Sequence, residues 1–489
     1  MMRKIPLLTA ILVLIKLNVA ADVVLYPDPG DLSEIEGIRE SGLFDVTVNG
    51  EDGFVYHGSE PEFNKYGYAK KGGHFFTFEH DDSSTVELSL KVDGEIEKFE
   101  VLPKLVEVEK ESSSVLNYSI KGYAKVLTKV WIAGEEQWFI LSAEEIEHEI
   151  PDSDDPSVLF LEAGVHQFGR TWDPFVDGVK TLYLAPGSVV QATIRSVDKK
   201  GISLIGKGVF AQAVWENGKQ VSPLKAEWMA DMMGMHFRDS EDIVVEGITV
   251  INCPSYQLEF ADCEEVYVNN VKLLGFGESN NDGMHLYGRH ILVENSFIGA
   301  SDDRICVTGL FDREKFEVTQ KSELQPRLED TDVHDMHIRN MVFWGQKNGG
   351  DIMITWNGGK TCQDILVEDC YSLGFTNKGF LAAKHGGSVV AKDILIRNIE
   401  LFHRRLVSLE VKEASCWGAG GGAIRDVLLE NVSIHAEPGE VDLQMLGHSE
   451  ESNISDITFV NLTANGQHIL SLDETAIKTN EFTKNIRFE

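Results

Sequence analysis

The chain has 489 residues, 43% hydrophobic and 25% charged, which is the composition of a folded globular protein and not of a disordered one. It carries 44 Lys and Arg against 79 Asp and Glu, which gives a formal net charge of −35. An acidic chain is repelled by phosphate backbones and by anionic lipid surfaces, so the charge argues against nucleic-acid and membrane partners.

An export signal is predicted over residues 1–21. Two basic residues precede an apolar run over residues 5–15, and Ala20 and Ala21 supply small residues for cleavage. The run is too short to span a bilayer, and no later stretch reaches the roughly 18 apolar residues of a transmembrane helix. We therefore expect a secreted protein, extracellular or periplasmic.

Residues 22–155 are predicted to form a β-sandwich of short strands. The segment 85–92 alternates apolar and polar residues, which is typical of an antiparallel strand with one buried face. Strands are expected at 45–48, 74–78, 85–92, 98–102 and 126–132.

Residues 158–489 repeat a seven-residue motif, typically Asp-Ile-Leu-Val-Glu-Asn-Val, at steps of 23 to 45 residues. A short motif at variable spacing, with no helical periodicity between copies, predicts a right-handed parallel β-helix. Segments 181–193 and 201–214 fit as earlier coils, and 312–332 as an insertion. The copies begin at Asp242, Glu265, His290, Asp335, Asp364, Asp393, Asp426 and Asp456.

Asparagine recurs at the sixth position of the motif. Asparagine tolerates a left-handed backbone better than most residues, so these positions are predicted to be the turns between stacked strands. They are Asn270, Asn295, Asn340, Asn398, Asn431 and Asn461.

The six cysteines all lie in the second half of the chain. Cys253 with Cys263, and Cys362 with Cys370, are close enough in sequence to form disulfides in an oxidising compartment. Equally, all of these can be small core residues. No Cys-x-x-Cys pairs or His-Glu-x-x-His motif occur, so no metal or other cofactor is predicted.

Three aspartates occupy equivalent places on adjacent predicted coils. Asp282 precedes the short strand 284–287, and Asp302 with Asp303 precedes the strand 304–307. Stacked coils lie about 4.8 Å apart, so the register alone brings the carboxylates together. Crowded carboxylates suit acid/base catalysis, because like charges raise at least one pKa. An exposed acidic turn or a calcium site is the alternative.

At these residues the sequence resembles glycoside hydrolase family 28, the polygalacturonases, and equally their clan relative family 49, the dextranases and isopullulanases. Asn-x-Asp-Gly at Asp282-Gly283, Tyr287, and Asp302-Asp303 match the shared pattern. The resemblance to family 49 covers most of the chain, since a β-sandwich precedes the β-helix there too. It implies an inverting hydrolase, with Asp302 as the acid and Asp282 and Asp303 as base or water-positioning groups.

Two departures from the polygalacturonase pattern bear on the substrate. The Gly-His-Gly of that family is replaced by Gly349-Gly350-Asp351, and of Arg-Ile-Lys only Lys384 remains. Arginine is the preferred bidentate partner of a uronate carboxylate. Its loss and the added Asp351 therefore favour a neutral sugar, such as an α-glucan of the dextran or pullulan type.

Other residues near these strands are candidates for contacts with a polysaccharide or oligosaccharide substrate. We expect Lys384 and Asp351 to hydrogen-bond sugar hydroxyls, Tyr256 and Trp356 to stack on sugar rings, and His285 to point away from the core. Trp344 is assigned to core packing. The protein is expected to be a monomer without cofactor.

Rival functions remain open at this point. A polygalacturonase-like hydrolase of acidic or algal polysaccharides would use Lys384 for uronate. A β-helix polysaccharide lyase needs a strong base next to the substrate carboxylate, commonly with Ca²⁺, and the missing Arg counts against it. A non-catalytic carbohydrate-binding protein would not need Asp302 and Asp303 together.

Overall fold

The computed structural model describes residues 22–33, 35, 37–58, 72–168, 172–211, 215–216, 219–220, 234–251, 253, 256–276, 281–307, 332–354, 361–415, 418–419 and 421–489. The predicted export signal, nearly all of the predicted insertion at 312–332, and Trp356 lie outside these residues. Within them, no helix is long and apolar enough to cross a membrane.

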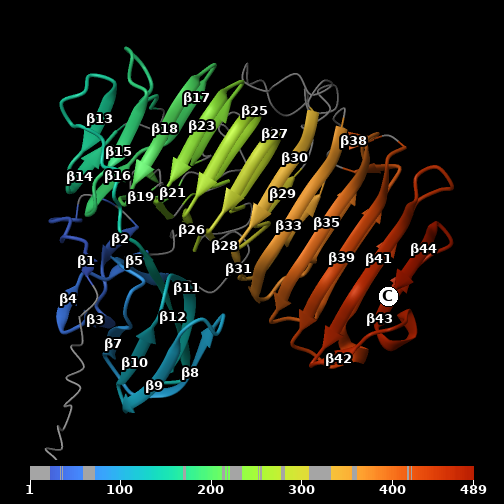
Figure 1. Cartoon of the computed structure of the whole chain (residues 1–489), viewed down its shortest axis with the longest axis horizontal. Coiled ribbons are helices and arrows are strands. Elements are labelled where there is room, and N and C mark those ends of the chain that lie inside the picture. The colour runs from blue at the N-terminus through green and yellow to red at the C-terminus, as the bar shows by residue number, and fades with distance from the viewer. Residues whose placement is uncertain are drawn as a thin grey trace, which may run out of the picture.

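Two sheets form the N-terminal β-sandwich, as predicted (Figure 1). The larger sheet has seven strands: β1 (Val23–Leu25), β2 (Ile38–Glu40), β5 (Tyr56–Gly58), β6 (Gly73–His80), β8 (Ile96–Leu102), β11 (Ala124–Ile132) and β12 (Glu135–Glu145). The smaller sheet has five: β3 (Phe44–Val48), β4 (Glu51–Gly53), β7 (Val86–Val92), β9 (Glu107–Ser112) and β10 (Val115–Ile120).

Strand β7 shows why the sandwich forms. Val86, Leu88, Leu90 and Val92 are buried, while Glu87 and Lys91 between them are exposed. The buried residues join an apolar core with residues of both sheets, such as Phe78 of β6. The alternation read from the sequence is therefore confirmed.

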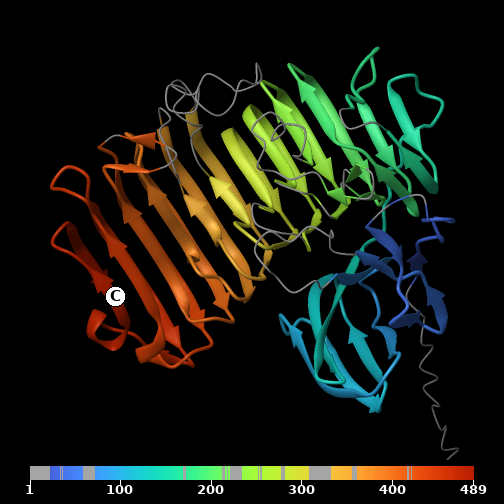
Figure 2. The ribbon, with the colours of Figure 1, turned by 180° about the vertical axis from the view of Figure 1, so that it is seen from behind.

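A right-handed parallel β-helix follows and runs to the C-terminus, as predicted (Figures 1 and 2). Each coil contributes to three parallel faces, which we call first, second and third in chain order. The first face contains β13 (Val158–Leu161), β15 (Thr181–Leu184), β18 (Lys200–Gly206), β23 (Glu241–Glu246), β30 (Asp332–Arg339) and β44 (Thr483–Phe488).

The second face contains β14 (Gly164–Gln167), β16 (Ser188–Gln191), β19 (Val209–Ala211), β24 (Thr249–Ile251), β26 (Lys272–Leu274), β28 (Phe297–Ala300) and β31 (Val342–Gly345). The third face contains β17 (Ile194–Val197), β22 (Met235–Arg238), β29 (Ile305–Val307), β32 (Gly350–Ile354), β34 (Gly379–His385), β36 (Arg405–Val411), β40 (Asp442–Leu446) and β43 (Ala476–Thr479).

Long strands continue from one face to the next. From the third face to the first run β25 (Leu258–Asn269) and β27 (Met284–Glu294); from the first to the second run β33 (Thr361–Gly374), β35 (Val390–Leu401), β39 (Ala423–Ile434) and β41 (Ile454–Ala464). The remaining short elements are β20 (Trp215–Glu216), β21 (Lys219–Gln220), β37 (Ala414–Ser415), β38 (Gly418–Ala419), β42 (Gln467–His468), η3 (Pro438–Glu440) and η4 (Leu472–Glu474).

The first and sixth positions of the seven-residue motif are both turns of the coil. All six predicted asparagines have φ between 53° and 57°, and all eight first residues of the motif have φ between 53° and 59°. The asparagine amides also hydrogen-bond from coil to coil, as from Asn461 to Asn431 at 2.8 Å and from Asn431 to Asn398 at 3.1 Å. The motif repeats because every coil needs a left-handed residue at the same two corners.

The sandwich packs against the second face of the β-helix. Trp138 of β12 meets Trp344 of β31 edge to face, with ring centroids 4.8 Å apart, so Trp344 is a core residue as predicted. Glu144 of β12 is buried at the same interface and pairs with Lys272 of β26 at 2.7 Å. A cavity of about 1020 Å³ adjoins Glu144 and Lys207.

The five described cysteines, Cys253, Cys263, Cys306, Cys362 and Cys370, are all buried and free. The two pairings considered from the sequence are therefore not formed. Cys263, Cys362 and Cys370 serve as small apolar residues in the core inside the coils.

Candidate active site

The coil register brings the three predicted aspartates together. Met284 of β27 pairs with Ile305 of β29, which pairs with Ile352 of β32. Two residues before each of these lie Asp282, Asp303 and Gly350, so the first two carboxylates stand in one column on adjacent coils. Asp302 stands beside that column, at the corner between the second and third faces.

Asp303 is the most enclosed of the three. Only 4% of its side chain is exposed, and its carboxylate accepts a 2.7 Å hydrogen bond from the Gly350 N–H and bonds of 3.0 and 3.1 Å from Lys378 Nζ. Both carboxylate oxygens of Asp303 are therefore engaged by donors of the protein.

Asp302 is the most exposed of the three, with 13% of its side chain accessible. Its carboxylate accepts a 3.1 Å hydrogen bond from the Asn348 side chain, and Lys378 Nζ lies 3.5 Å away. It is therefore the carboxyl best placed to meet a group arriving from solvent.

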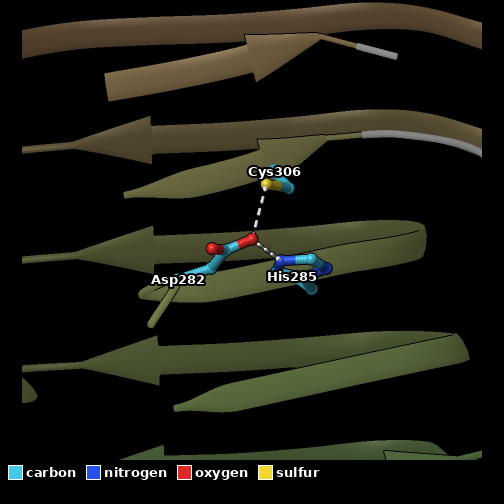
Figure 3. Close-up of side chains that lie close together, drawn as sticks. All are labelled: Asp282, His285 and Cys306. Carbon is cyan, nitrogen blue, oxygen red and sulfur yellow. Dashed lines mark hydrogen bonds and ion pairs between the residues drawn. The ribbon is translucent and has the colours of Figure 1, made fainter. Parts of the chain in front are cut away.

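Asp282 has a different environment. Its side chain is 9% exposed, and its Oδ2 lies 2.8 Å from His285 Nε2 and 3.9 Å from the Cys306 thiol (Figure 3). Burial raises the pKa of Asp282, and the neighbouring charge of Asp303 adds to the rise, while His285 opposes it. Asp282 is thus a carboxyl that holds a proton more readily than an ordinary aspartate.

Lys378 was missed by the sequence interpretation, which placed the retained lysine at Lys384. Burial alone would lower the pKa of Lys378, but Asp303 and Asp302 raise it above its usual range, so the ammonium stays charged. The strand register around β34 is the signal that could have indicated Lys378. Lys378 directly precedes Gly379, which pairs with Gly350 of the column.

Lys384 is exposed on the outward side of β34. It lies five residues beyond Gly379, roughly 16 Å along the strand from the aspartate column. Lys384 therefore does not belong to the carboxylate cluster, and its contact with a more distant sugar residue stays a prediction.

Asp351 was expected to contact sugar, and this is wrong. Its side chain is 1% exposed and accepts a 2.8 Å bond from Arg304 Nε and another from the Ser372 hydroxyl. Arg304, fully buried, in turn donates to the carbonyls of Asp302 at 2.8 Å and Asn348 at 2.7 Å. Asp351 therefore acts within the protein, by orienting the arginine that fixes the backbone of Asp302.

Two glycines allow these corners to approach each other. Gly349 has φ +82°, and a Cβ there would lie 2.3 Å from the carbonyl carbon of Asp302. A Cβ on Gly283 would lie 2.4 Å from the Arg304 carbonyl oxygen. The Asp-Gly and Gly-Gly pairs in the sequence are thus required by the close stacking of coils around the carboxylates.

The aromatic candidates are partly corrected. His285 points away from the core, as predicted, but it is 4% exposed and stacks under Tyr256, with ring centroids 3.7 Å apart. Tyr256 is 5% exposed and has one ring face against His285, so its expected stacking on a sugar ring is wrong. Trp356 lies outside the described residues.

Three carboxylates with different partners can share the work of hydrolysis. Asp303 is paired with Lys378, Asp282 has a raised pKa because it is buried, and Asp302 reaches solvent. A proton donor and a proton acceptor on the two sides of a bond are what hydrolysis of a glycoside requires.

Residues 183–320 match the family model described as Glycosyl hydrolases family 28, and all three aspartates lie within that match. Over 223 residues the chain is 26% identical to an exopolygalacturonase, clone GBGE184, of Arabidopsis thaliana, covering 40% of this chain and 50% of the relative. It is 25% identical over 145 residues to a polygalacturonase of Cryptomeria japonica, covering 27% of each. The match thus spans half or less of these relatives.

Among solved structures, Dex49A from Penicillium minioluteum is similar over 95% of this chain and 96% of its own, with a TM-score of 0.60 and 12% sequence identity. At that identity the likeness concerns the fold, and it includes both the sandwich and the β-helix. The resemblance to family 28 that was predicted from the aspartate motifs is confirmed over residues 183–320, and the two-part fold expected from the resemblance to family 49 is confirmed by the likeness to Dex49A.

Proposed function

On the premise of this relationship to the glycoside hydrolases of families 28 and 49, we propose that the protein is a secreted, monomeric, inverting glycoside hydrolase of polysaccharides. The observation that carries the proposal is the cluster of Asp282, Asp302 and Asp303 around Lys378. Holding three carboxylates together on two coils costs free energy, and a catalytic role would explain why the protein contains this cluster.

In the proposed reaction, Asp302 donates its proton to the glycosidic oxygen as the bond between that oxygen and the anomeric carbon breaks. A water molecule held by Asp303 and Asp282 attacks the anomeric carbon from the opposite side, and one of these carboxylates takes its proton. The exposure of Asp302 supports its role as the acid, and the donors around Asp303 support its role as an anion.

Lys378 supports this division of roles. It lies 3.0 Å from Asp303 and 3.5 Å from Asp302, so its charge favours the anionic form of Asp303 more strongly. The ammonium thereby keeps an acceptor ionised next to a donor, without which the crowded carboxylates would share protons.

A neutral glycan, α-glucan by preference, is the substrate class that we propose. The net charge of −35 repels polyanions at long range. In addition, Arg304 is fully buried against Asp351, so this arginine next to the carboxylates is not available to hold a uronate.

An acidic polysaccharide is the second candidate, and one observation favours it. Lys347 and Arg404, both exposed, lie on the second-to-third corner of the coils that follow the carboxylates. Together with the two polygalacturonase relatives, this basic corner keeps a pectic or algal substrate under test.

The experiment is a comparison of reducing-sugar release from dextran, pullulan, polygalacturonate and algal galactans by the purified protein. We expect release from dextran or pullulan, and release from polygalacturonate alone would support the second candidate. Ultraviolet absorption by an unsaturated product would identify a lyase. Binding without release from any of these glycans would overturn the proposal in favour of a carbohydrate-binding protein.

A further inference from the structure

Three potential metal ligands lie together on the outward side of the third face. Asp282 precedes β27, His285 lies in β27, and Cys306 lies in β29 directly opposite His285 in the register. One ligand atom from each of the three lies within 4.8 Å of the other two (Figure 3). Because the three residues come from two coils, their spacing in the sequence does not predict the cluster.

The separations are close to those that a metal ion needs. Asp282 Oδ2 lies 2.8 Å from His285 Nε2 and 3.9 Å from Cys306 Sγ. Ligands at about 2.0 to 2.3 Å around tetrahedral zinc lie roughly 3.3 to 3.8 Å from each other. Shifts below about 1 Å would therefore bring the three atoms around one ion.

The chemistry of the three atoms selects the ion. A thiolate sulfur and an imidazole nitrogen favour zinc and similar transition metals, and they disfavour calcium and magnesium, which prefer oxygen. Three protein ligands leave a fourth position for water.

His285 is already oriented as a metal ligand. Its Nδ1 contacts the Tyr287 hydroxyl, and its ring stacks on Tyr256, so Nε2 is directed at Asp282. A hydrogen bond to the other ring nitrogen is the usual way in which proteins fix a ligating histidine.

We propose that Asp282, His285 and Cys306 form a binding site for Zn²⁺ or a similar divalent transition metal, and that occupancy inhibits the enzyme. The inhibitory effect rests on the function proposed above, whereas metal binding does not. An ion bound to Asp282 engages a carboxylate that the proposed reaction uses to hold water. Metal binding at this site thus inhibits hydrolysis reversibly.

A second cluster, Glu264, Glu265 and His290, has less to offer a metal. It is partly exposed, it lacks sulfur, and Arg289 already pairs with Glu264. It does provide an internal control, because cobalt bound there has no sulfur ligand.

The test uses the full-length protein, treated with chelator and then titrated with Co²⁺ or Zn²⁺. Thiolate bound to Co²⁺ gives a charge-transfer absorption in the near ultraviolet, which a purely oxygen and nitrogen site lacks. We expect this band at one Co²⁺ per chain in the wild type and in Cys370→Ala, the matched control at another buried free cysteine. Cys306→Ala should lack the band.

Activity provides the second readout. We expect Zn²⁺ to inhibit the wild type and Cys370→Ala, with recovery on addition of EDTA. In Cys306→Ala, the Zn²⁺ concentration for half inhibition should rise at least tenfold. Loss of a residue that only hydrogen-bonds a metal ligand already lowers metal affinity about 10- to 100-fold, and Cys306 is itself a proposed ligand.

Each outcome separates the two proposals. A cobalt band that Cys306→Ala removes, in a protein that hydrolyses no glycan, would support the metal site and overturn the proposed function. No band in the wild type, or equal zinc inhibition of the wild type and Cys306→Ala, would overturn the metal site whatever the activity.

Discussion

Two buried clusters of lysine and carboxylate side chains in this protein have opposite charge balances. At the interface of sandwich and β-helix, Glu144 lies 2.7 Å from Lys272 and 3.1 Å from Lys207, with Lys125 nearby. In the candidate active site, Lys378 faces three aspartates. The first cluster holds three lysines and two glutamates, since Glu79 also pairs with Lys207 at 3.2 Å, and the second holds one lysine among three aspartates.

The pKa values follow the charge that is in the minority. Burial would raise the pKa of Glu144, but Lys272 and Lys207 lower it to about 2. Burial lowers the pKa of Lys272 to about 8. Glu144 opposes this shift, while the neighbouring Lys207 and Lys125 add to it. In the active site, Lys378 is the stabilised charge and Asp282 is the one whose pKa moves toward neutrality.

Burial alone therefore does not identify a catalytic carboxylate in this protein. Glu144 is as deeply buried as any of the three aspartates, yet its charge is fully compensated and it fastens two domains. The carboxylates of the active site outnumber their cation, and a proton can therefore reside on one of them.

The largest effect is expected from Asp302→Asn. Loss of the general acid should reduce the rate of polysaccharide hydrolysis by about 10³-fold. The free energy of unfolding, measured by thermal unfolding, should stay within about 1 kcal/mol of the wild-type value. A glycosyl fluoride, whose leaving group needs no proton, should recover much of the rate in Asp302→Asn and not in Asp303→Asn. Equal loss on both substrates would remove Asp302 from the role of acid.

At the interface, Glu144→Gln should cost stability instead of activity. Removal of the carboxylate takes away the 2.7 Å partner of the buried Lys272 and one of the two carboxylate partners of Lys207, and we expect about 3 kcal/mol of destabilisation in urea unfolding at pH 7. The turnover of the folded variant should match the wild type. A variant of unchanged stability would show that the cluster does not fasten the domains.

Acid should expose the same cluster. The pKa of Glu144 is about 2 in the folded protein against 4.5 for an ordinary glutamate, so its contribution is present above about pH 5 and is lost as the pH falls toward 2. Integrated over that window, the loss is about 3 kcal/mol. Urea unfolding at stepped pH should show a weaker acid dependence for Glu144→Gln than for the wild type, and parallel curves would contradict this.

Lys378→Met tests the cation of the active site. Without the ammonium, Asp302 and Asp303 lose the cation that contacts both of them, so we expect the turnover number to fall about 10²-fold. Lys384→Met, at an exposed position of β34, the strand that follows Lys378, is the control and should retain turnover within a few-fold. If the two variants behave alike, Lys378 has no special part in catalysis.

The smallest expected effect has the opposite sign. Because the folded-state pKa of Asp282 is raised, its ionised form disfavours the folded state at high pH, and the penalty vanishes as the pH falls below that pKa. Asp282→Asn should therefore stabilise the protein by about 1 kcal/mol at neutral pH and by less in acid. Destabilisation at neutral pH in thermal unfolding would contradict the charge balance inferred for this cluster.

The sequence predicts the β-helix because its stacking imposes a repeat. The asparagine and aspartate corners recur for a steric reason, and the same register placed Asp282 next to Asp303 without any structure. The sandwich follows from alternation in strands such as β7. Periodic constraints of this kind are readable in a single chain.

The errors concern corners, where the chain has no period. Lys378 reaches Asp303 from two coils away, and the number of residues between the coils cannot be counted reliably through loops of varying length. Asp351 looked exposed until the structure put Arg304 against it, and Tyr256 until it put His285 there. Which side of a corner a side chain takes depends on neighbours that only the fold supplies.

The stereochemistry of the first product shows directly whether the three aspartates hydrolyse the glycosidic bond with inversion. Proton NMR of α-glucan hydrolysis, recorded before mutarotation, reports the anomer that the enzyme releases. We predict the β-anomer, formed by attack of a water held between Asp282 and Asp303. Release of the α-anomer would mean that one aspartate attacks the sugar itself, and would contradict the account.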